Sequence, residues 1–288
     1  MAKRVVFSAL TQAPYVRPFT ADLQWAGGFA LSQKQKNVAA LHSAYAAVYP
    51  ADTVLEISRA SAEDCGRACS AFNLRLFVPS LGRKAALENV FQSSKVFAHG
   101  GPYPDLLDTD PVSAKKDPRL INGGELHGFR FEGTDYPLTP KTAFYDFIYI
   151  RALRENPALA DAISAYDAFS DIAFDPERSI NCQAHAAALY TSLRRLGQLE
   201  QTERFEDFVA LIAPEQAAAK AAAPAAGTDA APKIDAPLRP GDEVVHPRFG
   251  VGKVAAAEDG AITVVFASAG EKRMQETWLR ANCTLNGG

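Results

Sequence analysis

The chain has 288 residues, of which 48% are hydrophobic and 22% are charged, a composition typical of a globular protein with a sizeable core. Its 30 lysines and arginines are offset by 33 aspartates and glutamates, and the net charge of −3 argues against non-specific binding of long duplexes. Any nucleic-acid contact is then expected at a local site for a short segment or one modified nucleotide. We expect no secretory signal and no membrane span, and hence a cytoplasmic protein.

The first predicted elements are short strands and turns in residues 1–31, followed by an amphipathic helix over 33–48 with Ser32 as its N-cap. Lys34 and Lys36 lie in the first turn of this helix, where positive charge is unfavourable. Either an anionic partner lies nearby or the basic turn is simply solvated.

The middle of the chain alternates between the two kinds of element. Strands are predicted at 53–58, at 72–78 and around 129–136, and helices at 62–69, from Leu87 to a stop at Gly100, and at 141–154, 158–170 and 180–196. We expect His185, on the last helix, to be packed rather than catalytic.

The helix that begins at Leu87 organises the rest of the chain. Glu88, Phe91, Gln92 and Lys95 recur at i, i+3, i+4 and i+7, so they share one stripe. Because the opposite side is apolar, the stripe is predicted to face a cleft. The alternative is an exposed helix on which these residues have no role.

A short basic run precedes a pair of glycines. Lys115, Lys116 and Arg119 come just before Gly123 and Gly124, a pattern that suits a pyrophosphate because cations and close backbone approach are both available. The alternative is again a solvated surface.

Two further patterns bear on metals. The four cysteines have no C-x-x-C spacing, so they predict neither a zinc site nor a disulfide framework, and Cys65 and Cys69 are expected to be buried thiols at helical spacing. Asp167, Asp171 and Asp175 recur every four residues but lack the glycine turn of an EF-hand, so we predict a capped loop and no metal.

The amino-acid composition changes twice toward the C-terminus. Residues 213–237 are rich in alanine and proline and predict a flexible tether, and 238–288 predict short strands separated by glycine turns, as in a small barrel. The fold class is then α+β: a mostly helical domain over 1–212, the tether, and an all-β module. The module resembles the Tudor-like tail of UvrD/PcrA-type helicases and the RNA-polymerase-binding module of CarD-like proteins.

Several motifs of residues 1–212 resemble one family. A segment from Ser70 to Asn73, followed by Glu88-x-x-Phe91-Gln92-x-x-Lys95, resembles the opening signature of the NADAR superfamily, the YbiA-like proteins tied to NAD and ADP-ribose chemistry. Segments 140–147, 154–157 and 180–195 resemble later parts of the family in the same order. The similarity is closest to NADAR proteins encoded beside DarT-type toxins. Residues 171–175 lack the tryptophan-glycine pair of YbiA-like members, so ligand contacts do not carry over there.

The resemblance implies cleavage of the N-glycosidic bond between ADP-ribose and a base, which passes through an oxocarbenium-like state. Glu88 is then the catalytic carboxylate. Lys95 either acts as a cation or attacks the opened ribose as an amine. The substrate-binding residues are predicted to be Asn73, Phe91, Gln92, Lys115, Lys116, Arg119 and Asn181, with the three cations on the pyrophosphate and Gln92 on the ribose. No cofactor is implied.

The leading hypothesis is a DNA ADP-ribosylguanosine glycohydrolase that acts on ADP-ribosylated single-stranded DNA as the antitoxin of a DarT-type toxin. One alternative is an enzyme of the same family with a small-molecule N-glycoside as substrate. The other is a non-catalytic module that binds the toxin, or RNA polymerase through residues 238–288.

Overall fold

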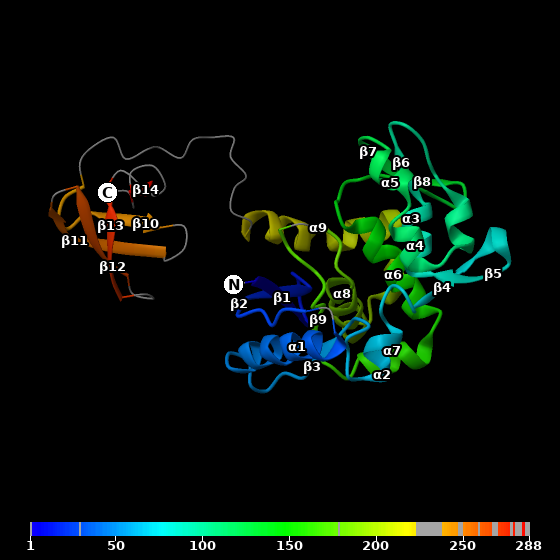
Figure 1. Cartoon of the computed structure of the whole chain (residues 1–288), viewed down its shortest axis with the longest axis horizontal. Coiled ribbons are helices and arrows are strands. Elements are labelled where there is room, and N and C mark those ends of the chain that lie inside the picture. Colours follow the sequence, from blue (N-terminus) through cyan, green and yellow to red (C-terminus); the bar gives the residue numbers. More distant parts are fainter. Residues whose placement is uncertain are drawn as a thin grey trace. The chain divides into compact units, whose positions relative to one another are not determined.

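A computed structural model describes residues 2–28, 30–177, 179–222, 238–246, 250–258, 260–266, 270–276, 279 and 284–285. The chain divides into two compact units, Met1–Ala218 and Ala219–Gly288 (Figure 1). The predicted α+β class is confirmed. Within the described residues, no helix is both long and apolar enough to span a membrane.

The first unit contains a four-stranded sheet in the order β2 (Val16–Leu23), β1 (Ala2–Ala9), β9 (Ala168–Ser170), β3 (Val54–Glu56). Strand β9 pairs antiparallel with β1 and parallel with β3. The predicted helix over 158–170 is therefore wrong at its end, because only α7 (Pro157–Ile163) is helical. All three residues of β9 are buried between two strands, and this tertiary pairing overrides the local pattern.

Helix α1 (Leu31–Ala46) packs against β1 and β2 of this sheet (Figure 1). It begins earlier than predicted, so Ser32 lies inside the helix and the N-cap is Ala30, which makes no side-chain cap hydrogen bond. The predicted amphipathic character holds, since Val38, Leu41 and Tyr45 are buried.

Helices α6 (Ala143–Arg154) and α8 (Gln183–Arg195) form the centre of the unit. They pack against each other, and α8 also contacts β1 and β9, so it joins the sheet to the helices (Figure 1). Both predicted helices are confirmed with shorter bounds. His185 is half-buried, edge-on to Phe7 at a centroid distance of 5.4 Å, in agreement with a packed role.

The organising helix is shorter than predicted. Helix α3 (Leu87–Ser93) is entirely buried, but the segment that contains Lys95 is strand β6 (Lys95–Phe97), not a continuation of the helix. The hydroxyls of Ser93 and Ser94 both donate to the carbonyl oxygen of Val90, a local bond that competes with further helix. Strand β6 pairs with β7 (Leu126–Phe131), and β7 forms a hairpin with β8 (Thr134–Tyr136).

Gly101, rather than ending a helix, lets the chain pass close to β6. A Cβ atom at this position would lie 2.2 Å from the carbonyl oxygen of Lys95, and the φ angle is 94°. The remaining elements of the unit are short. They are α2 (Asp64–Ala68), α4 (Pro111–Lys115), α5 (Pro118–Asn122), the hairpin of β4 (Arg75–Val78) and β5 (Arg83–Ala86), and three 3₁₀ turns at Pro79–Leu81, Pro104–Asp108 and Leu199–Thr202.

The described cysteines, Cys65, Cys69 and Cys182, are free thiols; Cys69 is buried as predicted, whereas Cys65 is only half-buried. Cys283 lies outside the described residues. No group of three or more metal-ligating side chains occurs within the part of the chain that the structure describes.

Helix α9 (Phe205–Ala222) runs into the predicted tether. The prediction of a non-helical tether is therefore wrong for 213–222, where alanine favours the helix, and 223–237 lie outside the described residues. The second unit is an antiparallel sheet of five strands in the order β13 (Gly270–Gln275), β12 (Ala261–Phe266), β11 (Gly250–Glu258), β10 (Glu243–His246), β14 (Thr284–Leu285). Short strands are thus confirmed, and a closed Tudor-like barrel stays a prediction.

Candidate functional site

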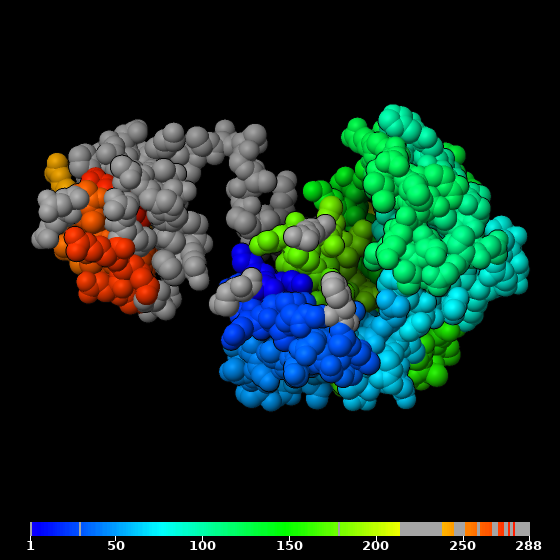
Figure 2. Space-filling model, in the orientation of Figure 1, coloured from blue at the N-terminus to red at the C-terminus, as the bar shows by residue number. Residues whose placement is uncertain are grey.

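A cavity of about 300 Å³ lies between α3, α6 and the loop before α8, and we call it the Glu88 cavity. Figure 2 shows the first unit hollowed between its blue N-terminal segments and its green segments. The cavity collects side chains that are far apart in sequence. Five of the predicted site residues line it: Glu88, Phe91, Gln92, Lys115 and Asn181.

Glu88 is a buried carboxylate with two polar neighbours. Its side chain is 6% exposed, and its Oε1 atom accepts a hydrogen bond of 2.8 Å from Nε2 of Gln92, one helical turn along α3. The same oxygen lies 3.5 Å from Nζ of Lys115 at the end of α4. The amide and the ammonium together orient the charge of Glu88 within the cavity.

Lys95 approaches this group from strand β6 and does not line the cavity. Its Nζ atom lies 4.8 Å from the centroid of the Phe91 ring, and Phe91 forms part of the cavity wall. Burial lowers the pKa of Lys95 to about 8; the charge of Glu88 opposes this shift and the charge of Lys115 adds to it. Both the ammonium and the free amine are therefore accessible near neutral pH.

Two of the residues that line the cavity each carry a buried acceptor atom with no partner among the described residues. They are Gln92, through Oε1, and Asn181, through Oδ1. An unpaired buried acceptor costs about 1–3 kcal/mol, so a ligand that brings hydroxyl donors relieves this cost. A ribose carries such hydroxyls.

The three cations of the predicted basic run do not lie at one site in the structure. Lys115 reaches the cavity, whereas Arg119 on α5 is held by Asp105 and Asp117 at 2.6 and 2.9 Å, and Lys116 is exposed. Neither Lys116 nor Arg119 lines the cavity.

Asn73 also lies away from the cavity. It is exposed, and its amide donates to the carbonyl oxygen of Arg67 at 2.8 Å. Its contact in the structure is therefore to a neighbouring turn.

Gln183, the first residue of α8, was not among the predicted site residues. Its Oε1 atom accepts from the backbone nitrogen of Ala71 at 2.8 Å, and its Nε2 atom donates to the carbonyl oxygen of Ile57 at 2.6 Å and to Oδ2 of Asp171 at 2.9 Å. One buried side chain thus joins three separate segments of the chain, at Ile57, Ala71 and Asp171. The sequence feature that could have indicated this role is a glutamine at the start of a largely apolar helix.

Asp171 is a second carboxylate on the cavity wall that sequence reasoning assigned only to a loop. It does hold a turn, because Oδ1 accepts from the backbone nitrogen of Ala173 at 3.0 Å. Burial raises the pKa of Asp171, and burial together with the charge of Asp171 raises the pKa of Glu56 behind it.

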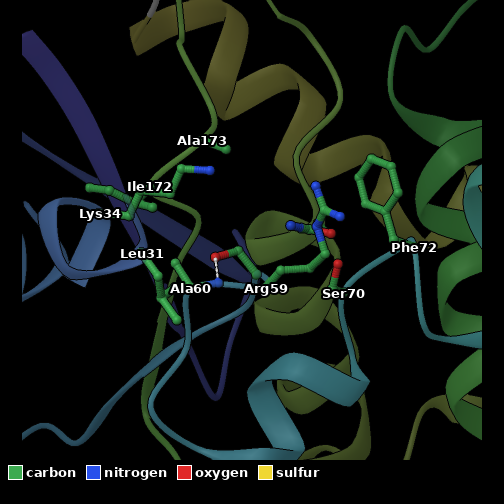
Figure 3. Close-up of a pocket in the computed structure, with 10 residues that line it drawn as sticks. Leu31, Lys34, Arg59, Ala60, Ser70, Phe72, Ile172 and Ala173 are labelled. Atoms are coloured by element: carbon green, nitrogen blue, oxygen red, sulfur yellow. Dashed lines mark hydrogen bonds between the residues drawn. The ribbon is translucent and has the colours of Figure 1, made fainter. Parts of the chain in front are cut away.

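A second pocket of about 270 Å³ adjoins the Glu88 cavity, and we call it the Arg59 pocket (Figure 3). The two share Phe72, Ala173 and Gln183 as a common wall. In Figure 3, Arg59 extends toward Phe72, and its guanidinium carbon lies 4.8 Å from the ring centroid.

The family comparison covers this whole region. A family model described as "DarT1-associated NADAR antitoxin" matches residues 2–222, which include both pockets and every residue discussed above. A comparison with curated proteins gives no match. The predicted relationship is confirmed, and the chain belongs to the family of DarT1-associated NADAR antitoxins.

Proposed function

We propose that this antitoxin is a glycohydrolase that removes ADP-ribose from guanosine in single-stranded DNA. The observation that carries the proposal is the buried Glu88 carboxylate, which lines a cavity together with Lys115 and with two side chains, Gln92 and Asn181, that each have an unpaired acceptor oxygen. The antitoxin family implies a cognate DarT toxin, and reversal of that toxin's DNA modification is the chemistry that such a site suits.

Breaking the bond between the ribose and the base leaves positive charge on the ribose. A fixed carboxylate that is itself buried stabilises that charge more than it stabilises the neutral substrate, which lowers the barrier. Glu88 takes this role, and Gln92 and Lys115 keep its oxygen in place. The unpaired oxygens of Gln92 and Asn181 accept hydrogen bonds from the ribose hydroxyls.

Lys95 lies beside the cavity wall at Phe91, and with its side chain turned into the cavity it completes the reaction in one of two ways. As an ammonium it gives a proton to the departing guanine nitrogen, and water then adds to the anomeric carbon to give ADP-ribose. As an amine it attacks the anomeric carbon of the opened ribose, the base leaves with a proton, and water hydrolyses the resulting imine to release ADP-ribose. Because burial lowers its pKa to about 8, a fraction of Lys95 is the free amine near neutral pH, and this supports the amine role.

A second candidate substrate is a small-molecule N-glycoside of ADP-ribose. The net charge of −3 favours it, since the protein has no general basic excess with which to attract a DNA strand. For residues 238–288, resemblance makes RNA polymerase the first candidate partner.

The test is to incubate the purified full chain with single-stranded DNA that carries ADP-ribosylated guanosine, and in parallel with NAD. We expect free ADP-ribose and unmodified oligonucleotide from the DNA, and no turnover of NAD. Turnover of NAD alone would favour the small-molecule substrate, and turnover of neither would favour an antitoxin that acts by binding.

A further inference from the structure

The Arg59 pocket differs in charge from the Glu88 cavity. Its only charged lining residues are Lys34 and Arg59, and neither forms an ion pair with a carboxylate within the described chain. Both side chains are exposed, so their charge is available to a ligand. The pocket therefore carries two positive charges with no opposing one.

Helix α1 adds to this positive potential. Leu31 and Lys34 of its first turn line the pocket, and that turn contains no acidic residue. The N-terminus of a helix of 16 residues carries a partial positive charge, which here is neither capped by the side chain of Ala30 nor neutralised by a carboxylate. A lysine in this place is unfavourable unless an anion binds.

The pocket also has apolar surface suited to a base. The Phe72 ring supports the Arg59 guanidinium, and Leu31 is 54% exposed although it is a large apolar side chain. Ala60, Ile172 and Ala173 complete the apolar part of the lining, as Figure 3 shows. Two cations beside an apolar wall are typical of a site for a nucleoside phosphate.

The two pockets are placed so that one ligand spans both. They share Phe72, Ala173 and Gln183, and the hydrogen bonds of Gln183 hold that wall in place. Small-molecule sites occupy about 300–1,000 Å³, so the Glu88 cavity alone lies at the lower limit of that range. A ligand as long as ADP-ribose needs the adjoining space.

We propose that the Arg59 pocket binds the pyrophosphate and adenosine of the ADP-ribosyl group while the scissile ribose occupies the Glu88 cavity. Lys34 and Arg59 bind the pyrophosphate, and the exposed side chain of Leu31 contacts the adenine. This inference rests on the proposed function, and it moves the pyrophosphate away from Lys116 and Arg119.

The alternative ligand for the pocket is the DNA strand itself, and two features favour the pyrophosphate. A pyrophosphate presents two negative charges close together, which matches two neighbouring cations, whereas a DNA strand carries one charge per nucleotide. The Glu88 cavity also has its own exposed apolar residue, Ile180, which is 59% exposed and offers the guanine a contact outside the Arg59 pocket.

The experiment measures binding, so that it does not depend on turnover. Calorimetric titrations of the full chain with ADP, with ADP-ribose and with an unmodified single-stranded oligonucleotide are compared between wild type, the double variant Lys34→Ala/Arg59→Ala, and a control. The control Lys36→Ala/Arg75→Ala removes two exposed cations that do not line the pocket, one of them also on α1. Thermal melting verifies that both variants are folded.

We expect the pocket variant to bind ADP and ADP-ribose at least about tenfold more weakly, with oligonucleotide affinity unchanged and the control like wild type. Unchanged affinity for ADP, or a loss confined to the oligonucleotide, would overturn the proposal. If ADP-ribose binding weakens as expected but no protein cleaves modified DNA, the subsite stands and the glycohydrolase proposal fails. If the pocket variant still cleaves modified DNA and still binds ADP like wild type, the glycohydrolase proposal stands and the subsite proposal fails.

Discussion

The two adjoining pockets differ in how their charges are used. In the Glu88 cavity the charges are paired or buried: Glu88 is buried and contacts Gln92 and Lys115. In the Arg59 pocket, Lys34 and Arg59 are exposed and no described carboxylate pairs with them. Burial makes a charge sensitive to a change in its neighbour and suits chemistry, whereas an exposed unpaired cation suits binding. The first pocket should therefore control rate and the second affinity.

A large effect on the cleavage rate is expected at Lys95, which lies beside the Glu88 cavity. If its amine is the nucleophile, Lys95→Arg should lower the cleavage rate about 100-fold, because a guanidinium keeps the charge but is a poor nucleophile. The wild-type rate should rise with pH through about 8, as the ammonium of Lys95 loses a proton and becomes the nucleophilic amine.

Borohydride trapping measures the same role directly. An ADP-ribose adduct should form on wild type but not on Lys95→Arg, with Lys116→Arg, an exposed lysine nearby, as the control. A wild-type rate that falls as pH rises through about 8, with no adduct, would assign Lys95 the role of a cation instead.

The buried carboxyl group of Glu56 should make the free energy of unfolding depend on pH. Burial and the charge of Asp171 raise the pKa of Glu56, so the folded state holds this proton to higher pH than the unfolded state does. The stability that this bound proton contributes is fully present below the ordinary pKa of a carboxyl group. It is lost as the pH rises from there through the raised pKa of Glu56.

The side chain of the Glu56→Gln variant is neutral at every pH. Its free energy of unfolding should therefore fall with rising pH by less than that of wild type, by an amount on the order of 2 kcal/mol. Denaturant unfolding at about pH 5 and pH 8 measures it, with the exposed Glu200→Gln as the control. Equal slopes for wild type and Glu56→Gln would mean that Glu56 titrates normally.

The basic run of Lys115, Lys116 and Arg119 allows three cations that are close in sequence but differ in surroundings to be compared. Lys115→Ala should lower cleavage about tenfold, because it removes the cation 3.5 Å from Glu88. Lys116→Ala and Arg119→Ala should stay within about twofold, since Lys116 is exposed and Arg119 is held by two aspartates. Steady-state rates on modified DNA decide this, and three equal losses would restore the run as one phosphate site.

The smallest effect is expected for the second unit. A chain ending at Ala222, where α9 and the family match both end, should cleave modified DNA within about twofold of full length, because both pockets lie within residues 31–183. It should protect cells less well at low expression if residues 238–288 bind a protein partner. A folded but inactive truncated chain would show that the second unit completes the site.

Much of the Glu88 cavity could be predicted from local spacing. Glu88 and Gln92 lie one helical turn apart on α3 and are hydrogen-bonded as that spacing suggests. The strong periodicities of α6 and α8 also gave those helices nearly correct bounds.

What could not be predicted depends on tertiary contacts. Lys95 lies on a strand because β7 pairs with it, and β9 exists only between β1 and β3. Arg59 and Lys34 come together because α1 packs beside the loop after β3, and no pattern within either segment indicates this.

Single-turnover cleavage of modified DNA, measured over a range of protein concentrations, tests the division between the pockets most directly. Glu88→Gln should lower the maximal rate by at least about 100-fold with the half-saturating concentration little changed. Lys34→Ala/Arg59→Ala should instead raise the half-saturating concentration about tenfold with the maximal rate little changed. If both variants change the same parameter, or if Glu88→Gln keeps more than a tenth of the wild-type rate, the account is contradicted.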